Sequence, residues 1–122
     1  RSSDLAAIAA LRSQLFYRGM SMTPEAKVKK KVVALLKDAG AYYFYPVTGG
    51  YGKSGVPDIV ACVNGMFVGI ECKAGKNKPT PLQEKNLREI VEAGGAALVI
   101  NETNIDLAAT IIKDIKDKQP KL

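Results

Sequence analysis

The Asn64-Gly65 dipeptide constrains the fold of this chain more than any other feature, because it is the strongest short signal for a two-residue β-turn. An apolar segment stands on each side of it, Asp58–Val63 before and Met66–Lys73 after. The pattern predicts a β-hairpin. Both strands are apolar on both faces, so we expect helices to pack on both sides of the sheet.

The turn also determines which residues face one another across the hairpin. If Val63 faces Met66, then Asp58 lies directly opposite Glu71. Opposed like charges destabilise a strand pair, so a compensating cation is expected, and hard divalent metals prefer carboxylate oxygens. Lys73 lies two residues beyond Glu71, on the same face. This set suits phosphodiester hydrolysis: a metal polarises the phosphate and lowers the pKa of a bound water, while Lys73 orients that water and offsets developing charge.

A purely structural interpretation of these three residues is also open. Asp58 can be an acid near a turn, and Glu71 with Lys73 can be a surface pair on an edge strand, since a lone D…ExK pattern often arises by chance. The predicted opposition of Asp58 and Glu71 favours the catalytic interpretation, because the structural one gives no reason for that register.

Caps, periodicity and breakers predict the remaining elements. Thr23 and Pro24 are typical of a helix start, and the helix that they begin ends at Gly40. After it we expect an aromatic strand over 41–47, a glycine-rich loop over 48–55, the hairpin, a basic loop over 74–79, a helix over 81–93, a strand over 96–101 and a helix over 106–118. The fold class is therefore α/β, with the order α-β-β-β-α-β-α.

One domain accounts for most of the 122 residues. We assign residues 22–122 to it and treat residues 1–21 separately, because Met20 and Met22 are both plausible native starts. Residues 1–21 are an N-terminal extension, in which Asp4–Phe16 can form an amphipathic helix, or sequence added for expression.

The charge balance narrows the kind of partner. Eighteen Lys and Arg residues against 12 Asp and Glu give a net charge of +6. That excess favours nucleic acid as a partner, although a basic protein without a polyanionic partner has the same composition. The chain has no His, which excludes His general bases and His metal sites. No apolar run is long enough to span a bilayer and no secretory signal is present, so we expect a cytoplasmic protein with no membrane partner.

The two cysteines, Cys62 and Cys72, are predicted to point to opposite faces of the hairpin. They are also about five residues apart along the paired strands, or roughly 17 Å, which excludes an intrachain disulfide. We expect both to be core residues.

Two polar residues on the helices have a sufficient structural explanation. Gln83 stands three residues after Thr80, which fits a capping box. Glu25 lies in the first turn of the first helix, where an acid complements the helix dipole. Spacing alone makes neither of them catalytic.

Basic and aromatic residues around the hairpin end are candidates for contact with DNA. They are Lys53, Lys76, Lys78, Lys85 and Tyr51. The lysines of the first helix are better explained as a solvated face.

Three stretches together resemble the VRR-NUC family of virus-type replication-repair nucleases, within the PD-(D/E)xK superfamily. They are Ser54-Gly55-Val56-Pro57-Asp58, then Gly69-Ile70-Glu71-Cys72-Lys73, then Lys78-Pro79-Thr80 with Gln83. The resemblance runs from Glu25 to about Val99 and is far more specific than D…ExK alone.

The resemblance implies a restriction-endonuclease-like core with a mixed central sheet flanked by helices, and a deoxyribonuclease activity that depends on Mg²⁺ or Mn²⁺. It implies catalytic roles for Asp58, Glu71, Lys73, Gln83 and Glu25, and metal ligation by Asp58, Glu71 and the backbone carbonyl of Cys72.

Short members of that family look similar to dimeric Holliday junction resolvases. We therefore expect a homodimeric endonuclease that cuts branched or structured DNA in phage or prophage replication, recombination or repair. Two alternatives stay open: a non-catalytic nucleic-acid-binding module on the same scaffold, and a nuclease that prefers single strands or RNA.

Overall fold

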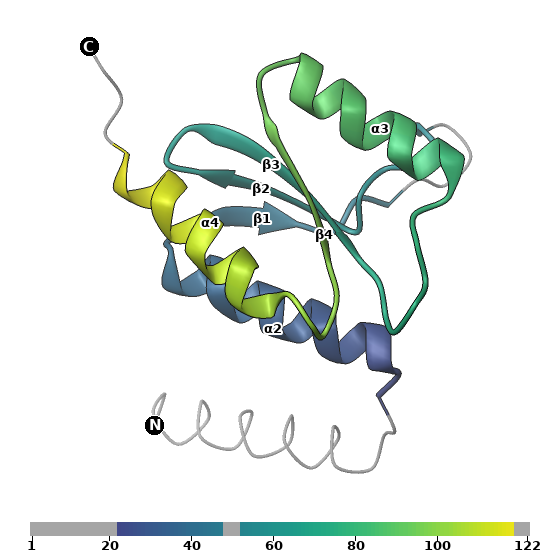
Figure 1. The fold of residues 1–122 in the computed structure, drawn as a ribbon. Coiled ribbons are helices and arrows are strands. Elements are labelled where there is room, and N and C mark those ends of the chain that lie inside the picture. The colour runs from purple at the N-terminus through teal and green to yellow at the C-terminus, as the bar shows by residue number, and fades with distance from the viewer. Residues whose placement is uncertain (1–21, 48–51, 119–122) are drawn as a thin grey trace, which may run out of the picture.

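A computed structural model describes residues 22–47 and 52–118 of the chain (Figure 1). The elements follow the predicted order of helices and strands. They are α2 (Pro24–Asp38), β1 (Tyr42–Phe44), β2 (Ile59–Val63), β3 (Met66–Cys72), α3 (Pro81–Glu92), β4 (Ala96–Ile100) and α4 (Ile105–Asp117). The predicted N-terminal extension, residues 1–21, lies outside the described residues.

The four strands form one mixed sheet in the order β1-β2-β3-β4. The pairs β1/β2 and β2/β3 are antiparallel, whereas β3 and β4 are parallel. A parallel pair needs a crossover, and α3 provides it. The α/β class and the mixed sheet flanked by helices are therefore confirmed.

The hairpin has the predicted register. Val63 pairs with Met66 and Ile59 pairs with Ile70. Asn64 has φ 48° and Gly65 has φ 82°, so both turn residues adopt the left-handed conformation that a two-residue hairpin favours.

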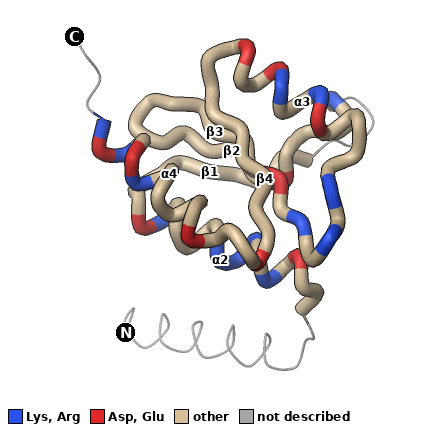
Figure 2. Tube along the Cα trace, in the orientation of Figure 1, with Lys and Arg blue, Asp and Glu red and all other residues tan. Residues whose placement is uncertain are grey.

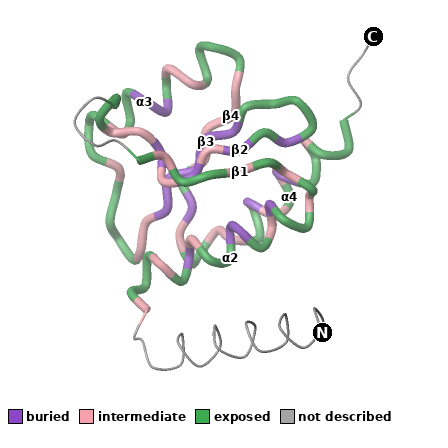
Figure 3. The backbone as a smooth tube through the Cα atoms, turned by 180° about the vertical axis from the view of Figure 1, so that it is seen from behind, coloured by how far each residue is buried: buried purple, intermediate pink, exposed green. Residues whose placement is uncertain are grey.

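Helices cover the two faces of the sheet unequally (Figures 1 and 3). On one face α2 and α4 pack against the sheet and against each other. The core on that side holds Val28, Val32, Val33, Leu36, Ile59, Ala61, Val63, Val68, Ile70, Cys72, Ile100, Ala108 and Ile112. On the other face α3 packs against β3 and β4, so the sheet surface beside it is only partly covered.

The uneven cover overturns one prediction about the cysteines. Cys72 is buried as expected, but Cys62 is exposed, so its assignment to the core is wrong. Cys62 pairs with Tyr42 and Phe67, on the face of the sheet that α3 covers only over β3 and β4. Both thiols are free, as the predicted geometry requires.

The first strand is shorter than predicted. The aromatic segment was expected to be extended over 41–47, but only Tyr42–Phe44 pairs with β2. Pro46 has no backbone N–H and cannot donate to a ladder, which agrees with the end of pairing before it.

The helices α2 and α3 begin at the predicted capping residues. Thr23 caps α2 by accepting a hydrogen bond from the Ala26 N–H at 3.1 Å. Thr80 and Gln83 form the predicted capping box at α3. Within the described part of the chain, no helix is long and apolar enough to cross a bilayer.

Candidate active site

Asp58 and Glu71 lie where β2 begins and β3 ends, on the face of the sheet that α3 covers. They lie one position beyond the last pair of the ladder, Ile59 with Ile70. The Cys72 N–H donates a hydrogen bond of 2.8 Å to Oδ2 of Asp58. This bond connects the carboxylate that precedes β2 to the backbone of β3, so the sheet itself sets the spacing of the two acids.

Glu71 is a buried acid with an incomplete set of partners. The residue is 1% exposed. Gln83 donates from Nε2 to Glu71 Oε1 at 3.2 Å, and Lys73 Nζ lies 3.7 Å from the same oxygen. The other oxygen, Oε2, is buried and has no hydrogen-bond partner among the described residues. Leaving a buried charged oxygen unpaired is costly, so a ligand is the natural explanation.

The electrostatics of the pair point the same way. The pKa of Glu71 is raised from 4.5 to about 7, mainly by burial and then by the neighbouring Asp58 carboxylate. Lys73 opposes the rise, because its positive charge favours the ionised carboxylate. A cation bound between Asp58 and Glu71 would offset the repulsion that disfavours the ionised form of Glu71.

Gln83 forms the predicted capping box and also contacts the candidate site. Its Oε1 accepts a hydrogen bond from the Thr80 N–H at 2.9 Å, which completes the capping box. Its Nε2 faces the other way and donates to Glu71. One side chain therefore couples the start of α3 to the buried acid.

Glu25 lies in the first turn of α2, at the edge of the same site. Its charge contributes to the raised pKa of Glu71, although less than Asp58 does. One turn further along α2, Lys29 lies over the ring of Tyr45 at 5.7 Å. The structure thus brings Glu25 towards the two central carboxylates without direct contact to them.

The residues present fit a hard divalent cation. Asp58 and Glu71 supply carboxylate oxygens, and Glu71 Oε2 is the buried atom that lacks a partner. Among the described residues, no group of three or more His, Cys, Asp or Glu side chains could hold a metal. A cation at this pair would therefore complete its shell with a backbone carbonyl and water, as Mg²⁺ commonly does.

The candidate DNA-contacting residues are spread over several elements. Lys76 and Lys78 are exposed on the loop between β3 and α3, and Figure 2 shows this loop near the start of α2. Lys53 pairs with Glu89 of α3, and Lys85 Nζ lies 4.0 Å from the same acid. Tyr51 lies outside the described residues.

The sequence analysis missed Asn86, a polar residue of α3 that is 4% exposed. Its Nδ2 donates to the carbonyls of Ser54 at 3.0 Å and Leu82 at 2.9 Å. Asn86 therefore holds the segment that leads to Asp58 against α3. Its spacing of three from Gln83, which places both on one helix face, was the available signal.

Gly55 allows that segment to approach α3 closely. It has φ 75°, and a Cβ atom there would lie 2.6 Å from Cγ of Leu82. A side chain at this position would therefore push the approach to Asp58 away from the helix.

Comparisons with known proteins agree with this fold and identify a nuclease family. The sequence matches the family model described as archaeal Holliday junction resolvase (Hjc) over residues 24–107. It is 30% identical over 87 residues to "Putative nuclease p44" of Acyrthosiphon pisum secondary endosymbiont phage 1, covering 70% of this chain and 91% of that protein. The structure is similar to a solved "VRR_NUC domain" with a TM-score of 0.62 and 20% identity, covering 75% of this chain and 97% of that one.

The structural likeness confirms the fold that the VRR-NUC resemblance implied. The family model spans more than half of the chain and includes Asp58, Glu71, Lys73 and Gln83. The chain therefore belongs to the archaeal Holliday junction resolvase (Hjc) family of nucleases.

Proposed function

We propose that this protein is a metal-dependent DNA endonuclease whose centre is Asp58, Glu71 and Lys73. The observation that carries the proposal is the buried Oε2 of Glu71, which lacks a partner beside a second carboxylate. Membership of a nuclease family supports hydrolysis of a phosphodiester as the reaction.

Each side chain has a distinct part in the proposed reaction. Asp58, Glu71 and the backbone carbonyl of Cys72 would hold Mg²⁺ or Mn²⁺. When bound, such a cation supplies Lewis-acid polarisation of the phosphate and makes a water molecule more acidic. Lys73, with its ammonium 3.7 Å from Glu71, orients the attacking water and offsets charge that develops on the phosphate.

Gln83 and Glu25 support this centre in different ways. Gln83 fixes one oxygen of Glu71 and leaves the other oxygen for the cation. Glu25 adds negative charge at the edge of the site, which favours a cation there.

We further propose branched or structured DNA, such as a Holliday junction, as the substrate of a cytoplasmic homodimer. The matching family is named for Holliday junction resolvases, and a similar protein is encoded by a phage. The net charge of +6 favours a polyanion. A role in phage or prophage replication, recombination or repair agrees with these relatives.

The test is cleavage of labelled duplex, single-stranded, flap and four-way-junction DNA with Mg²⁺, Mn²⁺ or EDTA. We expect metal-dependent cutting by the wild type and none by Asp58→Ala. Asp58→Asn is the matched variant, because it keeps an oxygen for the Cys72 N–H and loses only the charge. We expect it to fold normally and to be inactive.

Each contrary result identifies another function. Cutting by purified Asp58→Ala would disprove the assignment of the site. DNA binding by the wild type without cutting under any metal would favour a non-catalytic binding module. Preferential cutting of single strands, or of RNA in a parallel assay, would keep the nuclease and replace the proposed substrate.

A further inference from the structure

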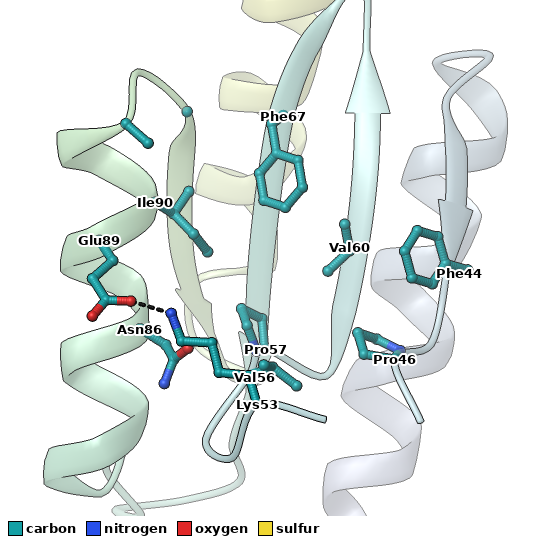
Figure 4. Close-up of a pocket in the computed structure, with 12 residues that line it drawn as sticks. Phe44, Pro46, Lys53, Val56, Pro57, Val60, Phe67, Asn86, Glu89 and Ile90 are labelled. Carbon is teal, nitrogen blue, oxygen red and sulfur yellow. Dashed lines mark hydrogen bonds and ion pairs between the residues drawn. The ribbon is translucent and has the colours of Figure 1, made fainter. Parts of the chain in front are cut away.

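A cavity of about 590 Å³ lies between α3 and the part of the sheet that α3 leaves uncovered (Figure 4). Val60 and Phe67 of the two central strands form its floor. Phe44 of β1 forms one wall, and Ile90 of α3 forms the opposite wall. Sites for small ligands typically have volumes of about 300–1,000 Å³ and mainly apolar walls.

One end of the cavity is adjacent to Asp58 along the chain. Pro57, which lines one end of it, is the residue before Asp58. Val60 pairs with Gly69, and each lies two residues along its strand from Asp58 or Glu71, hence on the same face. The offset is roughly 7 Å at the rise of a strand, which is comparable to the reach of a base from its own phosphate.

Two phenylalanine rings leave apolar surface open in this cavity. Phe44 and Phe67 are each 48% exposed, although both belong to the sheet. Gly69 lets Ile90 of α3 pack directly on β3 at this end of the cavity, since a Cβ there would lie 2.5 Å from Cδ1 of Ile90. Accessible ring faces beside a site for phosphate chemistry are the surfaces on which unpaired bases stack.

Charged residues stand at the mouth of the cavity. Lys53 reaches across it to Glu89 of α3, and Lys85 lies 4.0 Å from that acid. Two ammonium groups share one carboxylate, so this edge keeps a positive charge. An apolar interior with a positive edge is complementary to a nucleotide, whose base is apolar on its faces and whose phosphate is anionic.

We propose that this cavity binds one unpaired base of the DNA substrate and thereby positions the adjacent phosphate at Asp58 and Glu71. The inference rests on the proposed function and specifies the kind of DNA that the site selects. Perfect duplex has no base to offer, whereas branch points and flaps do. The cavity would therefore contribute to a preference for structured DNA.

The experiment measures binding in EDTA, so that cleavage plays no part in the result. The probes are flap and four-way-junction DNA in which each nucleotide flanking the branch is replaced in turn by an abasic analogue. At one of these positions, we expect the wild type to bind the abasic DNA roughly tenfold more weakly than the intact DNA. A loss of affinity of this size corresponds to one stack of a base on an aromatic ring.

Variants of the two rings show whether the cavity causes this discrimination. Phe67→Ala and Phe44→Ala should bind the intact DNA roughly tenfold more weakly than the wild type does. They should also bind intact and abasic DNA equally, because removing either the ring or the base removes the same contact. Phe67→Leu keeps apolar volume and should show the same loss. Tyr42→Ala is the matched control, since Tyr42 is an aromatic of β1 that is 74% exposed and does not line the cavity.

Two outcomes would overturn the proposal. One is equal binding of intact and abasic DNA at every position by the wild type. The other is a change from dimer to monomer in sedimentation of the ring variants with base discrimination intact, which would make the cavity an interface between copies. If the wild type cuts no DNA in Mg²⁺ or Mn²⁺, the proposed nuclease function is wrong. The binding measurements in EDTA would still test whether the cavity binds a base.

Discussion

Glu71 is a buried acid whose ionisation is electrostatically unfavourable in the fold. A Glu side chain that is 1% exposed stands beside Asp58 and uses only one oxygen in a hydrogen bond. A core acid of this kind destabilises the folded protein when it is ionised without a cation. This cost agrees with the proposed role of Glu71 in cation binding, which would offset the buried charge.

The raised pKa of Glu71 predicts how stability depends on pH. The folded protein holds this proton up to about pH 7, whereas the unfolded chain releases it near 4.5. The folded state binds more protons in that window, so its stability falls as pH rises through it. Glu71→Gln cannot ionise, and at pH 8 in EDTA we expect it to be more stable than the wild type by about 3 kcal/mol.

Chemical denaturation of both proteins between pH 4 and pH 8, without metal, measures this difference. At pH 8, added Mn²⁺ should then stabilise the wild type and leave Glu71→Gln unchanged. A gap between the two proteins that stays constant with pH would show that Glu71 does not titrate in this range.

Lys73 predicts a separation of chemistry from metal binding. Its ammonium contacts Glu71 Oε1, whereas the oxygen without a partner is Oε2. Lys73→Gln should therefore reduce the cleavage rate roughly 100-fold or more while metal affinity changes much less. Single-turnover cleavage and calorimetric titration with Mn²⁺ measure the two effects. Equal losses in both would contradict the proposed role.

The start of α3 is the element that couples folding to the site. Its capping box satisfies two backbone N–H groups, and the same Gln83 reaches Glu71. Asn86, on the same face of α3, holds the segment before Asp58. A single helix therefore sets the position of both strand ends that carry the acids.

A pair of variants separates the two roles of Gln83. Thr80→Ala removes the cap and should lower the free energy of unfolding by about 1 kcal/mol with little effect on cleavage. Gln83→Ala should cost a similar amount of stability and also reduce cleavage, because Glu71 loses its amide partner. Thermal unfolding and cleavage rates are measured on both variants. A comparable loss of activity in Thr80→Ala would mean that the cap alone accounts for the effect.

Across the whole molecule, basic residues are distributed unevenly around the site. The loop that joins β3 to α3 carries Lys76 and Lys78 directly after the strand that holds Glu71. Lys37, in contrast, lies in the last turn of α2, at the opposite end of the helix from Glu25. DNA that reaches the acids is therefore expected to pass the β3-α3 loop.

This arrangement predicts a change in the salt dependence of DNA binding. Each phosphate contact contributes about −0.9 to the slope of log K against log salt concentration. The double variant Lys76→Ala/Lys78→Ala should flatten that slope by up to about two. Lys37→Ala/Lys113→Ala changes net charge equally and should leave the slope nearly unchanged. Titrations at several KCl concentrations in EDTA measure it, and equal slopes for both double variants would exclude the loop as a contact.

Local sequence was sufficient for the hairpin and for the pairing of its acids. Asn64-Gly65 allows only a tight turn with positive φ, and side-chain alternation then places Asp58 opposite Glu71. The start of α3 was equally predictable, because the capping box is formed by residues three positions apart. These features depend only on residues that are close together in the sequence, so a local sequence pattern is sufficient to predict them.

Tertiary structure decided what each face of the sheet meets. The sequence places Cys62 in an apolar strand, but α3 docks over β3 and β4 and leaves this residue of β2 exposed. The same docking brings Gln83 to Glu71 and Asn86 to Ser54, over separations of 12 and 32 residues. Burial and long-range contacts depend on where a whole helix packs. The local sequence pattern of one strand does not predict that position. The sequence thus determined the acids of the site, and helix packing determined their partners and the cavity beside them.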